Sequence, residues 1–275
     1  MKILFLGDIF GRPGREGLQN ALPKLRKEYK PDVVGANVEN LAHGHGLTKE
    51  ALKYVSEAGV DFFTSGNHIW EGRDSKELLQ DDKLPLARPA NYPPGAYGKG
   101  FFKVPVGTRT LLVINLMGRV FMKNQIDCPF RKADEILAEF GIDKASGAGS
   151  ISEMSEGEID AVFVDFHAEA TSEKKVLGFY LDGRISGLVG THTHVPTADE
   201  QILLGGTGYL TDAGMCGVTD SSIGLDKDAM IKEMLTQVPQ KKDVAEGMVE
   251  IGGVLMEIGR DGKCRKIKRI REFVD

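Results

Sequence analysis

The amino-acid sequence predicts an α/β protein with a two-layered sheet, or with one sheet whose second half is antiparallel. In the first half of the chain, short apolar runs alternate with amphipathic segments. The connections between them are short, which is typical of βαβ units with right-handed crossovers. In the second half the apolar runs follow one another with less helical sequence between them. A uniformly parallel sheet is therefore not expected.

The elements of the first half are bounded by residues that start or stop them. Pro13 suits the first turn of a helix, Pro31 follows its end, and Thr48 is an N-cap candidate for the next helix. We expect strands at 2–7, 32–38 and 60–64, and helices at 13–29, from Thr48 to about residue 57, and at 73–80.

The second half is predicted mainly from its apolar runs. We expect strands at 101–104, 110–116, 160–166, 186–190, 201–204 and 207–211, and a hairpin of 244–258 with 263–273. Residues 141–158 are rich in Gly, Ser and Glu and poor in large apolar groups, which predicts a flexible insertion. Because strands on both sides are needed for one core, we expect residues 1–275 to form a single domain.

Composition restricts the class of protein. The net charge of −5 gives no general reason to bind polyanions, although the basic stretch KCRKIKRIRE leaves contact with RNA open beside its interpretation as a solvated edge strand. Three scattered cysteines favour reduced thiols over disulfides or a zinc ribbon. Asp8 comes too early for a secretory leader, and no run is long enough to span a bilayer. We expect a cytoplasmic protein without membrane contact; a homo-oligomer remains open.

Five predicted strands end in polar side chains that can bind metal ions. Ligand sites of α/β sheets lie beyond the carboxyl ends of the strands. The side chains there are Asp8; Glu39 and Asn40; Asn67 and His68; His167; and His192 and His194. Oxygen and imidazole ligands without thiolate suit Mn, Fe, Ni or Zn. Seven or eight ligands are more than one tetrahedral zinc ion can bind. This number predicts two metal ions about 3.5–4 Å apart that share a carboxylate, an arrangement used for phosphoester hydrolysis.

Each ending also has a purely structural interpretation. Asp8 could cap a turn, and His167 could be a buried structural histidine. His192 and His194 point to opposite sides of an extended chain, so the chain must bend between them or pass beside two ions. The opening GDIFGRPG lacks the G-x-G-x-x-G spacing of dinucleotide sites. A nucleotide-binding oxidoreductase stays an alternative, as does a regulatory metal-binding protein that acts through a partner.

The ordered set of endings resembles the calcineurin-like metallophosphoesterase superfamily. Phe10 stands where that superfamily usually has histidine, and Glu39 with Asn40 where it usually has aspartate. With these departures the sequence resembles the bacterial YmdB-like subgroup. The motifs ANVENLAHGHGLT, SGNHIW, VDFHAEATSEK and GTHTHVPTAD carry the same resemblance. The resemblance implies a layered α/β/β/α sandwich with mixed sheets. It also implies a dinuclear-metal phosphodiesterase that hydrolyses 2′,3′-cyclic nucleotides, or another small phosphodiester, to monophosphates.

The resemblance also implies the role of each residue. One metal ion would be held by Asp8, Glu39, Asn40 and His194, and the other by Glu39, Asn67, His167 and His192, with Glu39 bridging. Asn40 would fill the gap that the missing imidazole at position 10 leaves. Iron or manganese is expected, with zinc or nickel as alternatives. A metal-bridging hydroxide would attack phosphorus, and His68 would protonate the leaving oxygen. We expect His43 and His45 to act in their loop without ligation, and Trp70 either to stack on a base or to pack internally.

Overall fold

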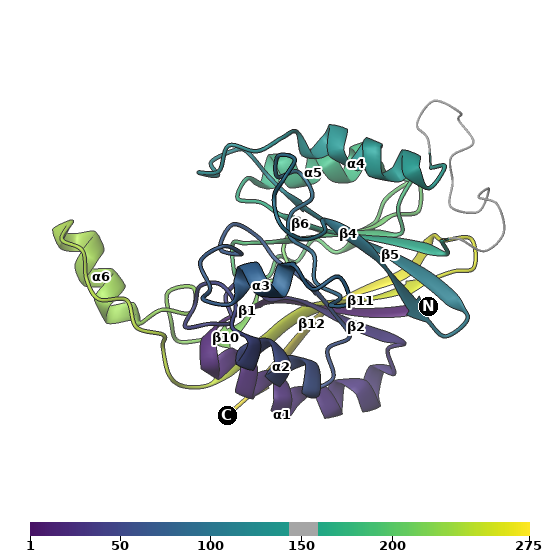
Figure 1. Cartoon of the computed structure of the whole chain (residues 1–275). Helices are drawn as coiled ribbons and strands as arrows, with labels where there is room; N and C mark the ends of the chain where they lie inside the picture. The colour runs from purple at the N-terminus through teal and green to yellow at the C-terminus, as the bar shows by residue number, and fades with distance from the viewer. Residues whose placement is uncertain (143–158) are drawn as a thin grey trace.

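Two six-stranded sheets pack face to face, with helices on both outer surfaces (Figure 1). The computed structural model describes residues 1–142 and 159–275, so nearly all of the insertion expected at 141–158 lies outside the described residues. The predicted α/β/β/α sandwich with mixed sheets is confirmed, and the alternative of one continuous sheet is wrong. The single-domain organisation stays a prediction.

The first sheet holds the N-terminal strands at its centre. Its strand order is β12-β11-β10-β1-β2-β3. β1 runs parallel to β2 and β10, and β2 runs parallel to β3, whereas β11 is antiparallel to β1, β10 and β12. The strands are β1 (Lys2–Ile9), β2 (Val33–Asn37), β3 (Phe62–Thr64), β10 (Met215–Val218), β11 (Val249–Ile258) and β12 (Cys264–Val274).

The second sheet is parallel in its middle and antiparallel at both edges. Its strand order is β4-β5-β6-β7-β9-β8, and only the pairs β4–β5 and β8–β9 are antiparallel. The strands are β4 (Phe101–Val106), β5 (Arg109–Met117), β6 (Ala161–His167), β7 (Gly187–Thr191), β8 (Gln201–Ile202) and β9 (Gly208–Leu210).

Helices cover the two outer faces. α1 (Gly11–Tyr29) and α2 (Lys49–Glu57) lie on the first sheet, and α4 (Pro129–Glu139) and α5 (Thr171–Leu181) lie on the second (Figure 1). The Thr48 side chain accepts a hydrogen bond from the amide of Ala51, which confirms it as the N-cap of α2. α3 (Ser75–Leu79) is a single short turn, and α6 (Lys227–Thr236) projects from the body with none of its residues buried. Among the described residues, no helix is both long and apolar enough to cross a membrane.

Alternation along the central strands divides the core into three layers. Ile3 and Phe5 of β1 point between the sheets, where Phe5 meets Phe163 with ring centroids 4.7 Å apart. Leu4 and Leu6, the intervening residues, point to the helices. This period of two is typical of strands that are covered on both faces. Full burial of each such side chain stabilises the fold by about 1.5–3 kcal/mol.

Some elements differ from those expected from the sequence. Helices α4, α5 and α6 and strand β10 were not among the expected elements. The strand expected from 244 begins at Val249, because Gly247, with φ of 136°, interrupts the extended chain just before it. The strand expected at 201–204 ends at Ile202, because the chain turns there and the Leu203 amide donates to the Thr207 carbonyl.

Candidate metal centre

The carboxyl ends of five strands meet at one end of the seam between the sheets. β1, β2 and β3 come from the first sheet, and β6 and β7 from the second. They carry or immediately precede the predicted ligands. Asp8, Glu39 and His167 are at most 1% exposed. The two sheets therefore bring side chains that are far apart in the sequence into one buried polar cluster.

The His167 Nε2 atom is the centre of one half of this cluster. It lies 3.2 Å from Glu39 Oε1, 3.0 Å from Asn67 Oδ1 and 3.0 Å from His192 Nδ1. An imidazole nitrogen carries at most one proton, so it cannot make a proper hydrogen bond with all three atoms. Three oxygen or nitrogen atoms crowded about a fourth are typical of ligands that face a common cation.

Asp8, Asn40 and His194 form the other half. The Nδ1 atom of His194 lies 2.9 Å from the Ile223 carbonyl oxygen, and its Nε2 atom faces Asp8 Oδ1 at 3.9 Å. The side-chain Nδ2 atom of Asn40 donates a hydrogen bond to the Gly44 carbonyl at 2.8 Å. Oδ1 of Asp8 and Oδ1 of Asn40 are buried without a hydrogen-bond partner among the described residues. A bare buried oxygen is unfavourable, and a bound cation is one kind of partner that would satisfy such an atom.

The residues present therefore fit a metal centre. Eight sequence-predicted residues gather here, and seven offer a carboxylate, amide or imidazole donor to the cluster or beside it. His68 differs, because its backbone amide, not its ring, contacts the cluster, donating to Glu39 Oε2 at 3.0 Å.

The charges of Glu39 and His167 stabilise each other within the cluster. Burial by itself would raise the pKa of Glu39, but the charge of His167 and a hydrogen bond with it lower that pKa to about 2. Burial likewise opposes the charged form of His167, yet Glu39 raises the pKa of His167 to about 9. Burial and the charge of His167 lower the pKa of His192 to about 3, and burial raises the pKa of Asp8. A cation can replace the proton on His167.

A buried hydrogen-bond network behind His167 fixes its orientation. The Thr191 hydroxyl donates to Asp165 Oδ1 at 2.7 Å, so its oxygen accepts from His167 Nδ1 at 2.9 Å. Asp165 also accepts from the side chains of Thr64 and Asn37. Burial raises the pKa of Asp165 to about 7, against the effect of His167. The network leaves Nε2 of His167 available for the cluster, as the outer hydrogen-bond partners of metal-binding histidines do.

The bend expected between the two histidines after β7 is present. His192 has φ of 99° and His194 has φ of 66°, both in the left-handed region. Their rings consequently face different halves of the cluster. The turn is held by Asp212, which accepts from the Thr193 amide at 3.2 Å and from Lys174 Nζ at 2.7 Å.

Gly66 is required by the close packing of the cluster. A Cβ atom at this position would lie 2.3 Å from His167 Nε2 and 2.4 Å from Glu39 Oε2. Any side chain would therefore displace two of the candidate ligands. The glycine of the Gly-Asn-His motif thus lets the chain pass directly beside the cluster.

His68 borders an open pocket at the edge of the cluster. Its Nδ1 atom lies 2.8 Å from Glu71 Oε1, and its ring centroid lies 4.6 Å from that of His45. The pocket has a volume of about 450 Å³ and is lined by Asn67, His68, Glu71, Phe121, Met122, Lys123, Asn124 and His192. His45, His68 and Glu71 form a second group whose donor atoms could hold an ion, although His45 and Glu71 are about half exposed.

Other candidates from the sequence lie outside the cluster. Trp70 packs edge to face on Tyr92 at 5.4 Å against the first-sheet core, which favours its packing interpretation. His43 is exposed. The basic C-terminal stretch is the edge strand β12, where Lys266 pairs with Glu257 and Arg271 pairs with Glu250. These pairs favour the edge-strand interpretation, and contact with RNA stays a prediction.

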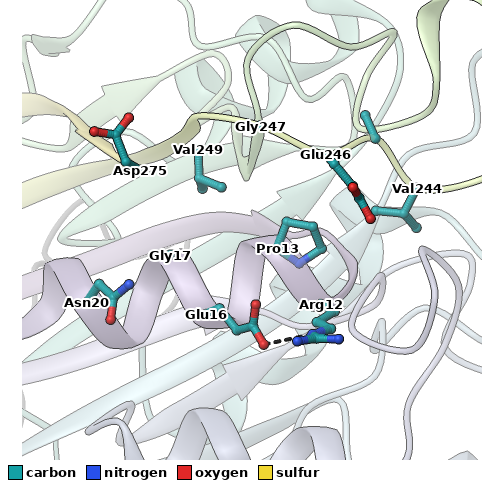
Figure 2. Close-up of a pocket in the computed structure, with 11 residues that line it drawn as sticks. Arg12, Pro13, Glu16, Gly17, Asn20, Val244, Glu246, Gly247, Val249 and Asp275 are labelled. Carbon is teal, nitrogen blue, oxygen red and sulfur yellow. Dashed lines mark hydrogen bonds and ion pairs between the residues drawn. The ribbon is translucent and has the colours of Figure 1, made fainter.

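A second cavity, of about 420 Å³, lies between α1 and the start of β11 (Figure 2). Arg12 and Glu16 of α1 form an ion pair of 2.7 Å at its rim, and Asp275 closes another side. None of the candidate ligands lines this cavity. This cavity is therefore separate from the candidate ligands, whereas Asn67, His68 and His192 line the pocket described above.

Several residues that orient the candidate ligands or His68 were not identified from the sequence. They are Asp165 and Thr191 behind His167, Glu71 beside His68, and Glu169, whose Oε2 lies 3.1 Å from His192 Nε2. Asp165 had a signal, since a carboxylate inside the apolar run AVFVDF must be paired when the strand is buried. Exposed residues such as Glu71 and Glu169 carry no comparable signal.

Comparison with known proteins decides the family. The sequence model of the YmdB-like protein family matches residues 4–270. The chain belongs to the YmdB-like family. It is 44% identical to the 2′,3′-cyclic-nucleotide 2′-phosphodiesterase of Bacillus subtilis (strain 168), over 98% of this chain and 96% of that protein.

Two solved structures match nearly the whole chain. A hypothetical protein from Thermus thermophilus superposes with a TM-score of 0.88 at 39% identity, covering 99% of both chains. A novel phosphatase from Mycoplasma pneumoniae gives a TM-score of 0.88 at 31% identity, covering 99% of this chain and 93% of that one. The predicted resemblance is confirmed. The predicted class of phosphoric ester hydrolase is confirmed as well, in preference to an oxidoreductase.

Proposed function

We propose that this YmdB-like chain is a dinuclear-metal phosphodiesterase that hydrolyses 2′,3′-cyclic nucleotides to nucleoside monophosphates. The observation that carries the proposal is the cluster itself, in which Glu39, Asn67 and His192 crowd the Nε2 atom of His167 and Asp8 contributes a buried oxygen without a hydrogen-bond partner among the described residues. The substrate class rests on the name of the B. subtilis relative and on its 44% identity over nearly the full length.

The donors divide naturally between two ions. Asp8, Glu39, Asn40 and His194 would hold one, and Glu39, Asn67, His167 and His192 the other, with the Glu39 carboxylate shared. Two such ions supply a hydroxide nucleophile at neutral pH and neutralise charge on the phosphoryl oxygens. Iron or manganese suits this mixture of oxygen and imidazole donors, with zinc or nickel as alternatives.

His68 is proposed as the general acid. Its Nδ1 atom is engaged with Glu71, which leaves Nε2 as the nitrogen that can give a proton within the pocket. When the bond between phosphorus and one ribose oxygen breaks, that oxygen takes the proton from His68 and leaves as a hydroxyl group. The hydrogen bond from the His68 backbone amide to Glu39 holds this residue beside the cluster, while its ring is not a ligand.

A single substitution tests this assignment. His68→Ala should lower kcat on 2′,3′-cAMP by about 100-fold or more while the metal content stays unchanged. Assays with 3′,5′-cAMP and bis(p-nitrophenyl) phosphate define the breadth of the activity. Absence of hydrolysis of all three esters by the parent chain with iron, manganese, zinc or nickel would contradict the proposal. Loss of metal from the variant would show that His68 is a ligand.

The setting of the reaction is also part of the proposal. A cytoplasmic location is supported by Cys128, Cys216 and Cys264, which are all free thiols. The small-molecule substrate fits the modest volume of the pocket beside His68, which lies within the range of ligand sites. A homo-oligomer stays a prediction.

A further inference from the structure

The wall of the pocket opposite the proposed general acid is formed by one loop. Phe121, Met122, Lys123 and Asn124 line it, facing Asn67, His68 and His192. This loop follows β5 and precedes α4. The loop contains no candidate metal ligand, so metal binding does not explain why it lies at the pocket.

Phe121 is unusually exposed for an aromatic residue, and its backbone conformation is unusual as well. Its side chain is 85% exposed although it lies beside a pocket. Its φ of 63° places it in the left-handed region, which favours glycine and is rare for bulky residues. Such a conformation costs about 1–3 kcal/mol and persists where the surrounding structure imposes it, most often at functional sites.

The surrounding structure does impose it, because both ends of the loop are anchored. The amides of Arg119 and Val120 donate to the Glu173 carboxylate at 3.0–3.1 Å, and Glu173 is only 8% exposed at the start of α5. After the tip, the Asn124 side chain donates to the Tyr92 hydroxyl at 3.2 Å. The tip that carries Phe121 is thus held at the mouth of the pocket.

We propose that Phe121 binds the nucleobase of the substrate by stacking. This inference rests on the proposed function, and it deepens it by assigning the nucleoside part of the site. The cyclic phosphate would lie between His68 and His192, and the base would lie on the Phe121 ring. Bases stack on aromatic rings in a sequence-tolerant way, because every base has a flat π-face.

The other residues that line the pocket support separate sites for the base and the phosphate. Apart from Met122, these residues are polar or charged, so Phe121 offers the one flat apolar surface among the described residues that line the pocket. Trp70, two residues after His68 in the sequence, is occupied by packing on Tyr92. Phe121 should therefore distinguish nucleotides from baseless phosphodiesters, and should discriminate only weakly between adenine and uracil.

The test compares two substrates that differ only in the base. One is 2′,3′-cAMP and the other is the 2′,3′-cyclic phosphate of methyl β-D-riboside. Phe121→Ala should lower kcat/KM for 2′,3′-cAMP by about 5- to 150-fold through KM, the range expected for one lost base stack. It should leave kcat/KM for the methyl riboside unchanged within about twofold. Phe121→Tyr should retain both activities.

Two further variants separate stacking from loop structure. Val120→Ala, in the same loop but outside the pocket lining, should change neither substrate. Phe121→Gly relieves the left-handed backbone, so it should keep or raise the thermal midpoint while it loses discrimination as Phe121→Ala does. An equal fall for both substrates, or no fall for either, would overturn the role of Phe121. Failure of the parent chain to hydrolyse either ester would instead contradict the proposed function.

Discussion

The Nδ1 atom of His68 lies 2.8 Å from Oε1 of Glu71, three residues along the same turn. On its other side the His68 ring meets that of His45 at 4.6 Å. Burial and the charge of His68 lower the pKa of His45, which favours the neutral form of His45. Glu71 orients the His68 ring, as the third member of a catalytic triad does for its histidine.

Glu71→Gln should weaken proton donation without removing the acid. We expect kcat on 2′,3′-cAMP to fall by about 10- to 100-fold, less than for His68→Ala, with metal content unchanged. Glu77→Gln, on the exposed side of α3, is the matched control. An unchanged rate would remove Glu71 from the mechanism.

Asn40 should determine whether the second ion is retained. Phe10 packs edge to face on His194 at 5.5 Å and provides no ligand where the wider superfamily has histidine. The Asn40 Oδ1 atom, like Asp8 Oδ1, is buried and has no hydrogen-bond partner in the part of the chain that the structure describes. Asn40→Ala should reduce the metal content from two ions per chain to about one, measured by elemental analysis after gel filtration.

Asn40→Asp provides the control for that experiment, because it keeps an oxygen donor at the same position. It should retain both ions. Two ions retained in Asn40→Ala would show that this side chain is not a ligand. Loss of both ions would show that the two sites do not bind independently.

Lys174 should be important for stability through its buried ion pair. Lys174 Nζ lies 2.7 Å from Asp212 Oδ2, and both side chains are 1% exposed. Lys174→Met leaves the Asp212 charge buried without its partner, which should lower the free energy of unfolding by about 3–5 kcal/mol. Lys175→Met removes a more exposed ion pair with Asp199, at 3.6 Å. This variant should change the free energy of unfolding by no more than about 1 kcal/mol. Equal denaturant midpoints for the two variants would contradict this account.

Lys123 should attract the phosphate of any substrate. It is the one lysine or arginine among the described residues that line the pocket. Lys123→Gln should lower kcat/KM by about 2- to 5-fold for 2′,3′-cAMP and for bis(p-nitrophenyl) phosphate alike, and the difference should shrink at high salt. Lys83→Gln is the surface control. An effect limited to nucleotides would assign Lys123 to the base instead.

The cluster was predictable because of a simple geometric rule. Asp8 and His167 lie at the ends of apolar runs, and parallel strands place such residues along one edge of a sheet. The sequence pattern does not determine how two sheets face each other, so it predicts the ligands better than their partners. The Ile223 carbonyl that orients His194 is 29 residues away from it. Phe121 had no periodic signal, since its role depends on a backbone conformation that is visible only in the fold.

The central claim is tested most directly by titrating the metal-free chain with Mn²⁺ or Fe²⁺ while hydrolysis of 2′,3′-cAMP is followed. We expect no turnover in the presence of excess chelator and two ions bound per chain at saturation. Full activity should appear only with the second equivalent. Turnover by the chelated chain, or full activity with a single bound ion, would contradict the dinuclear centre built from Asp8, Glu39 and His167.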